Sequence, residues 1–218
     1  MYLRGYTEGM EPKLEHPSPF EFSGGALCLD FVNTVGDRPH CDNEKLAGFA
    51  DLLRWSAEAG ILVEDQLGRL AREAARRPRL AHAAFRRAVQ LRERLYRIFS
   101  KLATGGRPGD EDLDGLNRAL AAALRHLRVE PEGDGFGWAW STPRTHFDHL
   151  VWPVARSAAE LLTSPETDLV RECASDRCSW MFVDRSRTHR RRWCDMKVCG
   201  NRAKARRHYL RKKRSSRR

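Results

Sequence analysis

Four of the six cysteines in the 218-residue chain lie close together, in two pairs of the form Cys-x4-Cys. Cys173 and Cys178 make the first pair, Cys194 and Cys199 make the second, and 15 residues separate the pairs. Thiolates bind borderline and soft cations, and zinc takes four ligands in a tetrahedron. This spacing predicts one structural zinc ion. An iron–sulfur cluster or two disulfides would use the same cysteines and stay open as alternatives.

A dense run of basic residues accompanies the second cysteine pair. Residues 185–218 contain 16 of the 40 Lys and Arg side chains but only one of the 29 acidic ones. The preceding residues hold 24 basic and 28 acidic side chains, so the net charge of +11 comes from this tail. Local charge density decides the attraction to polyanions, and the tail therefore predicts a nucleic-acid partner. The alternative is a tail that only aids solubility.

We expect Asn201 to cap a helix whose surface is mostly basic. Like charges at three- and four-residue spacing repel one another, and phosphates would relieve that repulsion. DNA is favoured over RNA, since a helix fits the major groove. An acidic protein or an anionic membrane surface is a further alternative. The predicted nucleic-acid contacts are Arg187, Arg190, Arg191, Arg202, Lys204, Arg206, Arg207, Arg211, Lys212, Lys213 and Arg214.

The residues between the two cysteine pairs alternate as a β-strand would. Residues 179–184 contain Trp180 and Phe182, and we expect a return strand over residues 190–193, which ends at Trp193. A module of about 45 residues needs apolar mass around its metal, so the three aromatic side chains are predicted to form its core. Stacking on nucleic-acid bases is the alternative use for them.

The residues before the cysteines show the three- and four-residue spacing of amphipathic helices. The expected helices cover residues 27–35, 43–60, 65–77, 80–102, 110–127 and 145–162. Residues 129–140 instead predict a β-hairpin with Phe136, Trp138 and Trp140 on one face. We expect this face to cover the helical core, with base stacking as the alternative.

These elements predict a mainly α protein with a small β-hairpin, an α+β arrangement in which a helical domain precedes a zinc module with four cysteine ligands. The zinc module should be treble-clef-like, with a β-hairpin and a basic C-terminal helix. The expected boundaries are 20–163 for the helical domain, 168–214 for the zinc module and 215–218 for a basic tail.

Catalytic patterns are missing from the sequence. It has no phosphate-cradling glycine loop, no Gly-x-Ser-x-Gly elbow and no internal repeat. His146 and His149 lack a third ligand at an obvious spacing, and we expect ordinary surface roles for them. Four thiolates would leave no open position on the zinc for a catalytic water. We therefore expect no enzymatic activity.

Other single residues and segments predict structural roles. Asp30 and Asn33 should form structural hydrogen bonds beside the first helix, and Cys28 and Cys41 should be buried thiols. No run of about 18 apolar residues occurs, and the first residues lack the pattern of a signal peptide. We expect a soluble cytoplasmic protein, at the nucleoid where it binds DNA.

The string from Arg191 to Met196, with Cys199-Gly200-Asn201-Arg202, resembles the CGNR zinc-finger family of bacterial proteins. The resemblance implies that the four paired cysteines are the zinc ligands. The surrounding family pattern is matched by Phe182, Asp184, Ser186, Arg192, Trp193 and Met196.

The segment from Gly24-Gly25 through residues 27–34 resembles the start of the ABATE domain that precedes such fingers. The two resemblances together imply a stress-induced transcription regulator. Its finger would bind nucleic acid, and its larger domain would sense a small-molecule effector or form a homodimer. The resemblance assigns no residues to either role of the larger domain.

Overall fold

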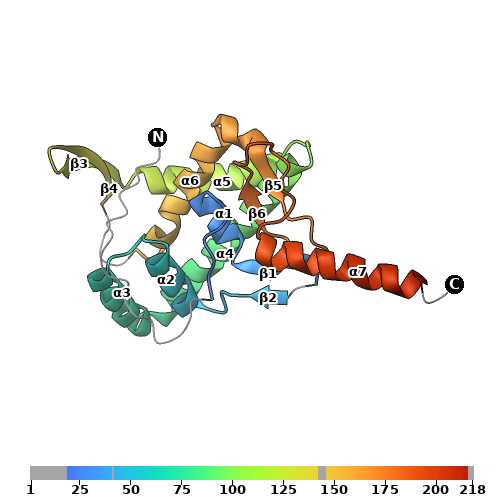
Figure 1. The fold of residues 1–218 in the computed structure, drawn as a ribbon. Helices are drawn as coiled ribbons and strands as arrows, with labels where there is room; N and C mark the ends of the chain where they lie inside the picture. The colour runs from blue at the N-terminus through green and yellow to red at the C-terminus, as the bar shows by residue number, and fades with distance from the viewer. Residues whose placement is uncertain (1–18, 41, 142–145, 216–218) are drawn as a thin grey trace.

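The protein is mainly helical, with three small antiparallel strand pairs (Figure 1). The computed structural model describes residues 19–40, 42–141 and 146–215. Its α-helices are α1 (Leu27–Val32), α2 (Phe49–Glu58), α3 (Glu64–Arg76), α4 (Pro78–Ala103), α5 (Asp110–Leu124), α6 (Trp152–Leu162) and α7 (Asn201–Ser215). This composition confirms the expected fold class, a helical body followed by a small cysteine-rich module.

The strands form three separate hairpins or pairs. They are β1 (Val35–Asp37) with β2 (Asp42–Glu44), β3 (Leu127–Glu132) with β4 (Gly135–Trp140), and β5 (Val170–Glu172) with β6 (Met181–Val183). Short helical turns connect the elements: η1 (Arg38–His40), η2 (Phe147–Val151), η3 (Pro165–Leu169) and the π-helical turn η4 (Met196–Gly200).

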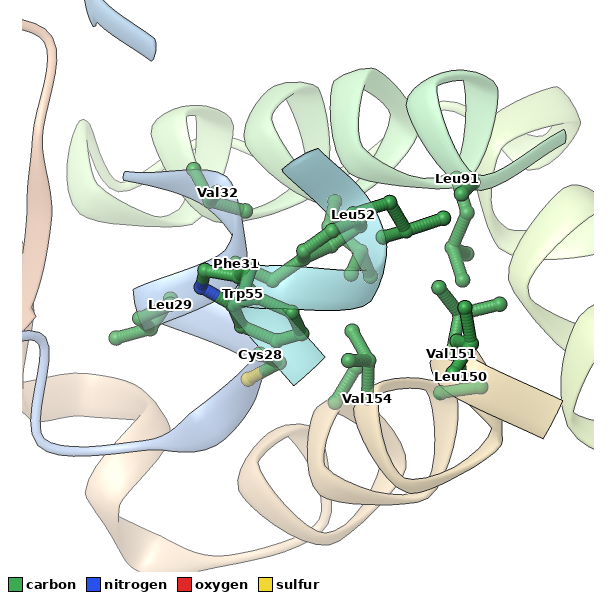
Figure 2. Packing of buried hydrophobic residues seen from close by; sticks show 14 of the residues in the cluster. Cys28, Leu29, Phe31, Val32, Leu52, Trp55, Leu91, Leu150, Val151 and Val154 are labelled. Carbon is green, nitrogen blue, oxygen red and sulfur yellow. The ribbon is translucent and has the colours of Figure 1, made fainter. Parts of the chain in front are cut away.

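Helix α1 packs against α4 and α6, and its side chains meet those of α2 in the main core (Figure 2). The Phe31 ring of α1 lies 4.7 Å from the Trp55 ring of α2, measured between centroids, and both side chains are fully buried. Leu91 of α4 and Val154 of α6 belong to the same cluster. Burial of each such side chain contributes about 1.5–3 kcal/mol, so this contact among four helices holds the body together.

Helix α4 is the longest element, and most other elements of the helical body pack against it. Its regular apolar spacing predicts such a buried face. Pro78 occupies its first turn, where a missing N–H costs no hydrogen bond. Its buried side chains recur every three or four residues and are Ala81, Ala84, Ala88, Leu91, Arg92, Leu95, Ile98 and Phe99. The buried Arg92 is paired with Glu44 at 2.6 Å and with Glu93 at 2.8 Å.

Four of the expected helices are shorter than the apolar pattern indicates. The first helix ends at Val32, because the chain then turns into β1 and Val35 pairs with Glu44. The second begins at Phe49, where the Asp51 carboxylate accepts hydrogen bonds from the backbone N–H of Ala47 (2.8 Å) and Gly48 (3.1 Å). The fifth ends at Leu124, because Leu127 already begins strand β3, and the sixth begins at Trp152, because residues 147–151 form the turn η2. An apolar spacing alone does not show where such ends and caps lie.

The expectation that the aromatic face of the β3–β4 hairpin covers the helical core is wrong for two of its three residues. Phe136 is 78% exposed and Trp138 is 59% exposed, whereas Trp140 is half-buried and its ring lies 5.8 Å from that of Trp152. Figure 1 shows the reason: the hairpin projects beyond the helices, so only its base meets them.

The strand between the cysteine pairs has a different partner from the one expected. Residues 181–183 pair with Val170–Glu172, which precede the first cysteine, and Arg171 is opposite Phe182. Residues 190–193 form no strand; one backbone hydrogen bond, from Ala174 N–H to the Arg192 carbonyl at 2.8 Å, ties them to the module. The hairpin therefore brackets the first cysteine pair instead of joining the two pairs.

Strand β6 is docked on the helical body by backbone and side-chain hydrogen bonds. The Val183 N–H donates to the Gly24 carbonyl (2.9 Å), and the Ser179 N–H donates to the Gly36 carbonyl (3.0 Å). Met181 and Val183 are buried in the same apolar cluster as α1 and α4. The hairpin thus forms one edge of the body's core.

A membrane-spanning segment does not occur in the part of the chain that the structure describes, where every helix is too short or too polar to cross a bilayer.

Candidate metal centre and nucleic-acid interface

Cys173, Cys178, Cys194 and Cys199 come together in one cluster, with all four sulfur atoms within 4.8 Å of one another. Two Sγ–Sγ distances, from Cys178 to Cys194 and from Cys194 to Cys199, are both 3.7 Å. Three of the side chains are buried and Cys178 is half-buried. It is the single group of three or more His, Cys, Asp or Glu residues with this arrangement among the described residues.

The cluster fits a zinc ion. Four sulfurs at about 2.3 Å from a tetrahedral zinc lie about 3.8 Å from one another, close to the two short distances in the cluster. Hydrogen bonds from the Cys178 and Cys194 thiols lower the pKa of Cys173 well below its usual range, while donation of those protons raises the pKa of Cys178 and Cys194. A dication at the centre would replace the shared protons and hold four thiolates.

The metal site is surrounded by the three aromatic residues expected there. Phe182 is fully buried, Trp180 is 7% exposed and Trp193 is half-buried, and all three belong to the cysteine cluster's apolar shell. The Lys45 ammonium lies 4.8 Å from the centroid of the Trp180 ring. The hydrophobic shell excludes water from the sulfurs, which favours a closed structural site.

Arg191, which the sequence placed among the nucleic-acid contacts, has a structural role in the fold. Its guanidinium lies over the Phe182 ring, 4.3 Å from the centroid. It donates hydrogen bonds to the backbone carbonyls of Trp193 (2.9 Å from Nε) and Cys194. Arg191 therefore braces the loop that carries the third ligand.

Asp184 organises the loop between the cysteine pairs. The sequence analysis matched it to the family pattern but did not predict this role. Its carboxylate accepts hydrogen bonds from the backbone N–H of Ser186 (3.0 Å) and of Arg191 (2.8 Å), and it is fully buried. Burial works against its charged form, but the hydrogen bonds from Ser186 and Arg191 prevail and lower the pKa of Asp184. An acid that directly follows a buried strand, with serine two residues on, is the signal for such a turn.

The turn η4 carries the chain from the zinc site into α7. Asp195 caps it, accepting the Val198 N–H at 2.8 Å. The expected cap Asn201 is instead the first residue of α7, and its Nδ2 donates back to the Lys197 carbonyl at 3.0 Å. A β-carbon on Gly200 would clash with Met196 Sδ, so glycine leaves room for the Met196 side chain against the turn. Because η4 continues directly into α7, the zinc ligand Cys199 fixes the helix's starting direction.

Helix α7 extends away from the rest of the molecule (Figure 1). Its larger apolar side chains, Tyr209 and Leu210, do not pack inward, because they are 63% and 47% exposed. Ala203 is half-buried near the start of the helix. The helix therefore gains almost nothing from apolar burial beyond its first turn.

Two contacts from the first half of α7 anchor it to the module. Arg206 forms an ion pair with Asp176, and Arg202 donates to the Arg177 carbonyl at 3.5 Å. Asp176 and Arg177 lie in the turn between the first two cysteines. The zinc site thus holds both the start of α7 and the turn that supports it.

The structure places the predicted basic contacts on two connected segments. Arg187, Arg190 and Arg191 lie on the exposed loop before the third cysteine. The predicted contacts that lie exposed on α7 are Arg202, Lys204, Arg206, Arg207, Arg211, Lys212 and Lys213. Arg214 belongs to the same helix, but its side chain is outside the described part of the structure. Residues 216–218 of the expected tail are also outside it.

The remaining residues singled out in the sequence lie away from the metal site. The His149 ring contacts Trp152 edge-on, and burial lowers the pKa of His149. Cys28 is fully buried, and burial raises the pKa of its thiol to about 12. Cys41 lies outside the described residues. Asn33 forms structural hydrogen bonds, as expected.

The chain matches two family models in the order that the resemblance implied. Residues 25–165 match ABATE, described as "Putative stress-induced transcription regulator". Residues 170–212 match the CGNR zinc finger. A search of the curated proteins found no match. Since the first model covers more than half of the chain, the protein belongs to the ABATE family and carries a CGNR zinc finger with one structural zinc site.

Proposed function

We propose that this protein is a DNA-binding transcription regulator in which the zinc site holds α7 ready to contact a DNA duplex. The observation that carries the proposal is the state of α7: a helix of 15 residues with exposed basic side chains and almost no apolar contact with the body. Such a helix is about 22 Å long and fits the major groove, which is about 12 Å wide.

The charge pattern of α7 favours phosphate contacts. Lys204, Arg207 and Arg211 are at three- and four-residue spacing and form one face of the helix, along with Leu210. Their mutual repulsion weakens the free helix, and neutralisation by phosphates removes that cost and releases counterions. Arginines that reach the groove floor would also read guanine edges.

Burial of two aromatic residues of the finger, Trp180 and Phe182, favours duplex DNA over single-stranded RNA. Recognition of unpaired bases uses exposed aromatic faces. Trp180 and Phe182 are buried beside the cysteines and do not offer such a face. RNA binding is therefore the weaker alternative, which competition between the two polymers tests.

The distribution of charge on α7 also argues against a membrane surface as its target. Helices that lie in a lipid interface have a wide apolar face opposite a basic one. The residues of α7 around the exposed Tyr209 and Leu210 are His208 and Arg211, and basic residues occur on all sides. A groove lined by phosphates matches this distribution better than a flat lipid surface.

The first experiment measures binding of the zinc-loaded full chain to a fluorescein-labelled duplex by anisotropy, from about 50 to 200 mM salt. We expect the affinity to fall steeply with salt. The triple variant Lys204→Gln, Arg207→Gln and Arg211→Gln should lower the slope of log K against log salt by about 2–3, since each lost phosphate contact removes about 0.9.

The matched control removes three exposed arginines from the body, Arg72→Gln, Arg76→Gln and Arg79→Gln. It lowers the net charge equally and should leave the salt slope unchanged. Equal losses in the two triple variants would mean that net charge alone drives the binding, and an affinity insensitive to salt would refute the proposal.

Zinc serves as a structural ion in this proposal, and no turnover is expected, because four thiolates close its coordination shell. A regulator of this kind would act in the cytoplasm, at the nucleoid. Homodimerisation through the ABATE domain stays a prediction, which light scattering of the purified chain tests.

A further inference from the structure

A basic hollow lies between α4, α5 and α6, on the body and away from the cysteines. Its volume is about 550 Å³. The α5 side of the hollow presents Gly115, Ala119 and Ala122, which recur every three or four residues and have little or no side chain. A β-carbon on Gly115 would lie 2.6 Å from Cδ and Nη1 of Arg94, so the glycine lets that arginine cross α5.

The rim of the hollow is strongly basic. Arg87, Arg94, Arg118 and Arg125 line it, with His126 and His146, and Asp148 is the one acid in the lining. This is a local concentration, because the residues before the basic tail hold more acidic than basic side chains. An excess of arginine around a concave surface attracts anions.

Two of these arginines already have partners within the fold. Arg87 donates to both carboxylate oxygens of Asp148, at 2.8 Å each, and so neutralises the one acid. Arg94 donates to the Glu111 carbonyl at 3.0 Å, and its guanidinium also lies 3.8 Å from an Asp112 oxygen.

Arg118 and Arg125 differ from that pair. Arg118 lies on α5 and Arg125 directly follows its last residue, about two turns further on, and both are exposed at the rim. Within the described residues, neither guanidinium has a hydrogen bond, ion pair or ring contact. Seven residues along a helix span about 10.5 Å, so a ligand of small-molecule size can meet either or both.

The floor of the hollow is apolar and aromatic. Leu91, Val151 and Trp152 are buried beneath it. The His126 ring stacks on the Trp152 ring at 4.1 Å with an angle of 7° between the planes. An apolar floor with a few convergent charged groups, at a volume of several hundred Å³, is the usual form of a small-molecule site.

We propose that this hollow binds a small organic anion, a molecule with an apolar body and one carboxylate, phosphate or sulfonate group. The apolar body would lie on the floor between α4 and α5. The anionic group would accept charge-assisted hydrogen bonds from Arg118 and Arg125. This site gives the ABATE domain a defined ligand chemistry and does not depend on DNA binding.

The hollow is connected to the finger through helix α4, so ligand binding in the hollow would act on the finger through one element. Arg87, Leu91 and Arg94 line it on one side of α4. On the other side of the same helix, Tyr96 and Ser100 donate to the Glu172 carboxylate of β5, at 3.0 and 2.8 Å. One rigid helix therefore contacts both the hollow and the strand that precedes the first zinc ligand.

The test uses two fluorescent probes with closely related ring systems, 1-anilinonaphthalene-8-sulfonate and the uncharged N-phenyl-1-naphthylamine, titrated into the zinc-loaded full chain. We expect saturable enhancement with the sulfonate and at least tenfold weaker binding of the uncharged probe. The double variant Arg118→Gln and Arg125→Gln should weaken sulfonate binding at least tenfold. The double variant Arg72→Gln and Arg76→Gln on α3 is the charge-matched control and should bind as the wild type does.

A steric variant keeps the test independent of charge. Ala122→Trp fills the hollow at an exposed helix position and should abolish sulfonate binding while circular dichroism and zinc content stay unchanged. The proposal is overturned if the Arg118 and Arg125 variant titrates like its control, or if Ala122→Trp binds the sulfonate normally. Duplex binding measured in parallel separates these outcomes from a failure of the proposed DNA-binding function.

Discussion

The carboxamide of Asn33 pairs with both backbone groups of Met181, although 148 positions separate the two residues in the chain. Its Nδ2 donates to the Met181 carbonyl at 2.9 Å, and its Oδ1 accepts the Met181 N–H at 2.7 Å. Asn33 is 2% exposed and Met181 is fully buried. One side chain at the end of α1 therefore acts as an additional strand partner for β6, a strand of the finger.

Replacement of Asn33 by alanine should destabilise the whole protein. The change leaves a buried N–H and a buried C=O of Met181 without partners, and each costs about 1–3 kcal/mol. We expect a loss of about 2–5 kcal/mol in the free energy of unfolding, measured by urea denaturation. Asn117→Ala, on the exposed face of α5, is the matched control and should change it by less than about 0.5 kcal/mol. A small effect at Asn33 would show that the finger's strand is held by other contacts.

The zinc site should hold one metal ion per chain, which elemental analysis of the purified protein measures. Cys194→Ser removes a ligand and should reduce the zinc content and the duplex affinity together, since a structural zinc contributes folding energy to the module around it. Cys28→Ala is the control for loss of a buried thiol outside the cluster and should keep one zinc per chain. Full zinc retention in Cys194→Ser would contradict the assignment.

Asp30 should make stability fall as pH rises. Burial raises the pKa of its carboxyl from 3.8 to about 6, although the Gly24 N–H partly offsets this. Between pH 4 and 6 the folded state then binds more protons than the unfolded state, so stability decreases across this window and stays lower above it. The change amounts to about 3 kcal/mol.

Asp30→Asn should remove this pH dependence and make the protein more stable at pH 7 than the wild type, with little difference near pH 4. Unfolding midpoints across the pH range measure the effect, and Asp114→Asn, on the exposed surface of α5, serves as the control. If the two variants share one pH profile, Asp30 does not carry the effect.

The exposed hairpin predicts a contrast between two phenylalanines. Phe136 is 78% exposed and Phe99 is fully buried in α4. Phe99→Ala should cost about 3–5 kcal/mol through lost burial and a cavity, whereas Phe136→Ala should stay within about 0.5 kcal/mol of the wild type. Thermal or urea unfolding measures both. A large loss at Phe136 would mean that the hairpin face is covered in solution, as a homodimer would cover it.

The sequence was most informative where chemistry or spacing is local. Four cysteines at fixed spacing point to a tetrahedral site whatever the fold, and the stripe from Ala81 to Phe99 gives a helix from its own neighbours. The partner of the β6 strand was not predictable in this way. Val170–Glu172 is a short segment with no alternation of its own, and its pairing depends on the body that Met181 docks against.

The exposure of the hairpin's aromatic residues and the presence of the basic hollow also could not be predicted from the sequence. Alternation places Phe136 and Trp138 on one face of a hairpin, but the direction in which the hairpin leaves the body decides whether that face is covered. The spacing of Gly115 and Ala119 reads as ordinary helix packing. It becomes a hollow because Arg94 and Trp152, from two other helices, border the space that small side chains leave.

The docking of β6 beneath α1 has a consequence for protein engineering. If residues 170–212 were grafted onto an unrelated carrier protein, Met181 and Val183 would lose their contacts with the apolar core of the body and become exposed to solvent. The transplanted piece would then need a replacement for the Asn33 carboxamide. A functional chimera of this protein should therefore exchange the finger together with α1, even though the two are separated by most of the chain.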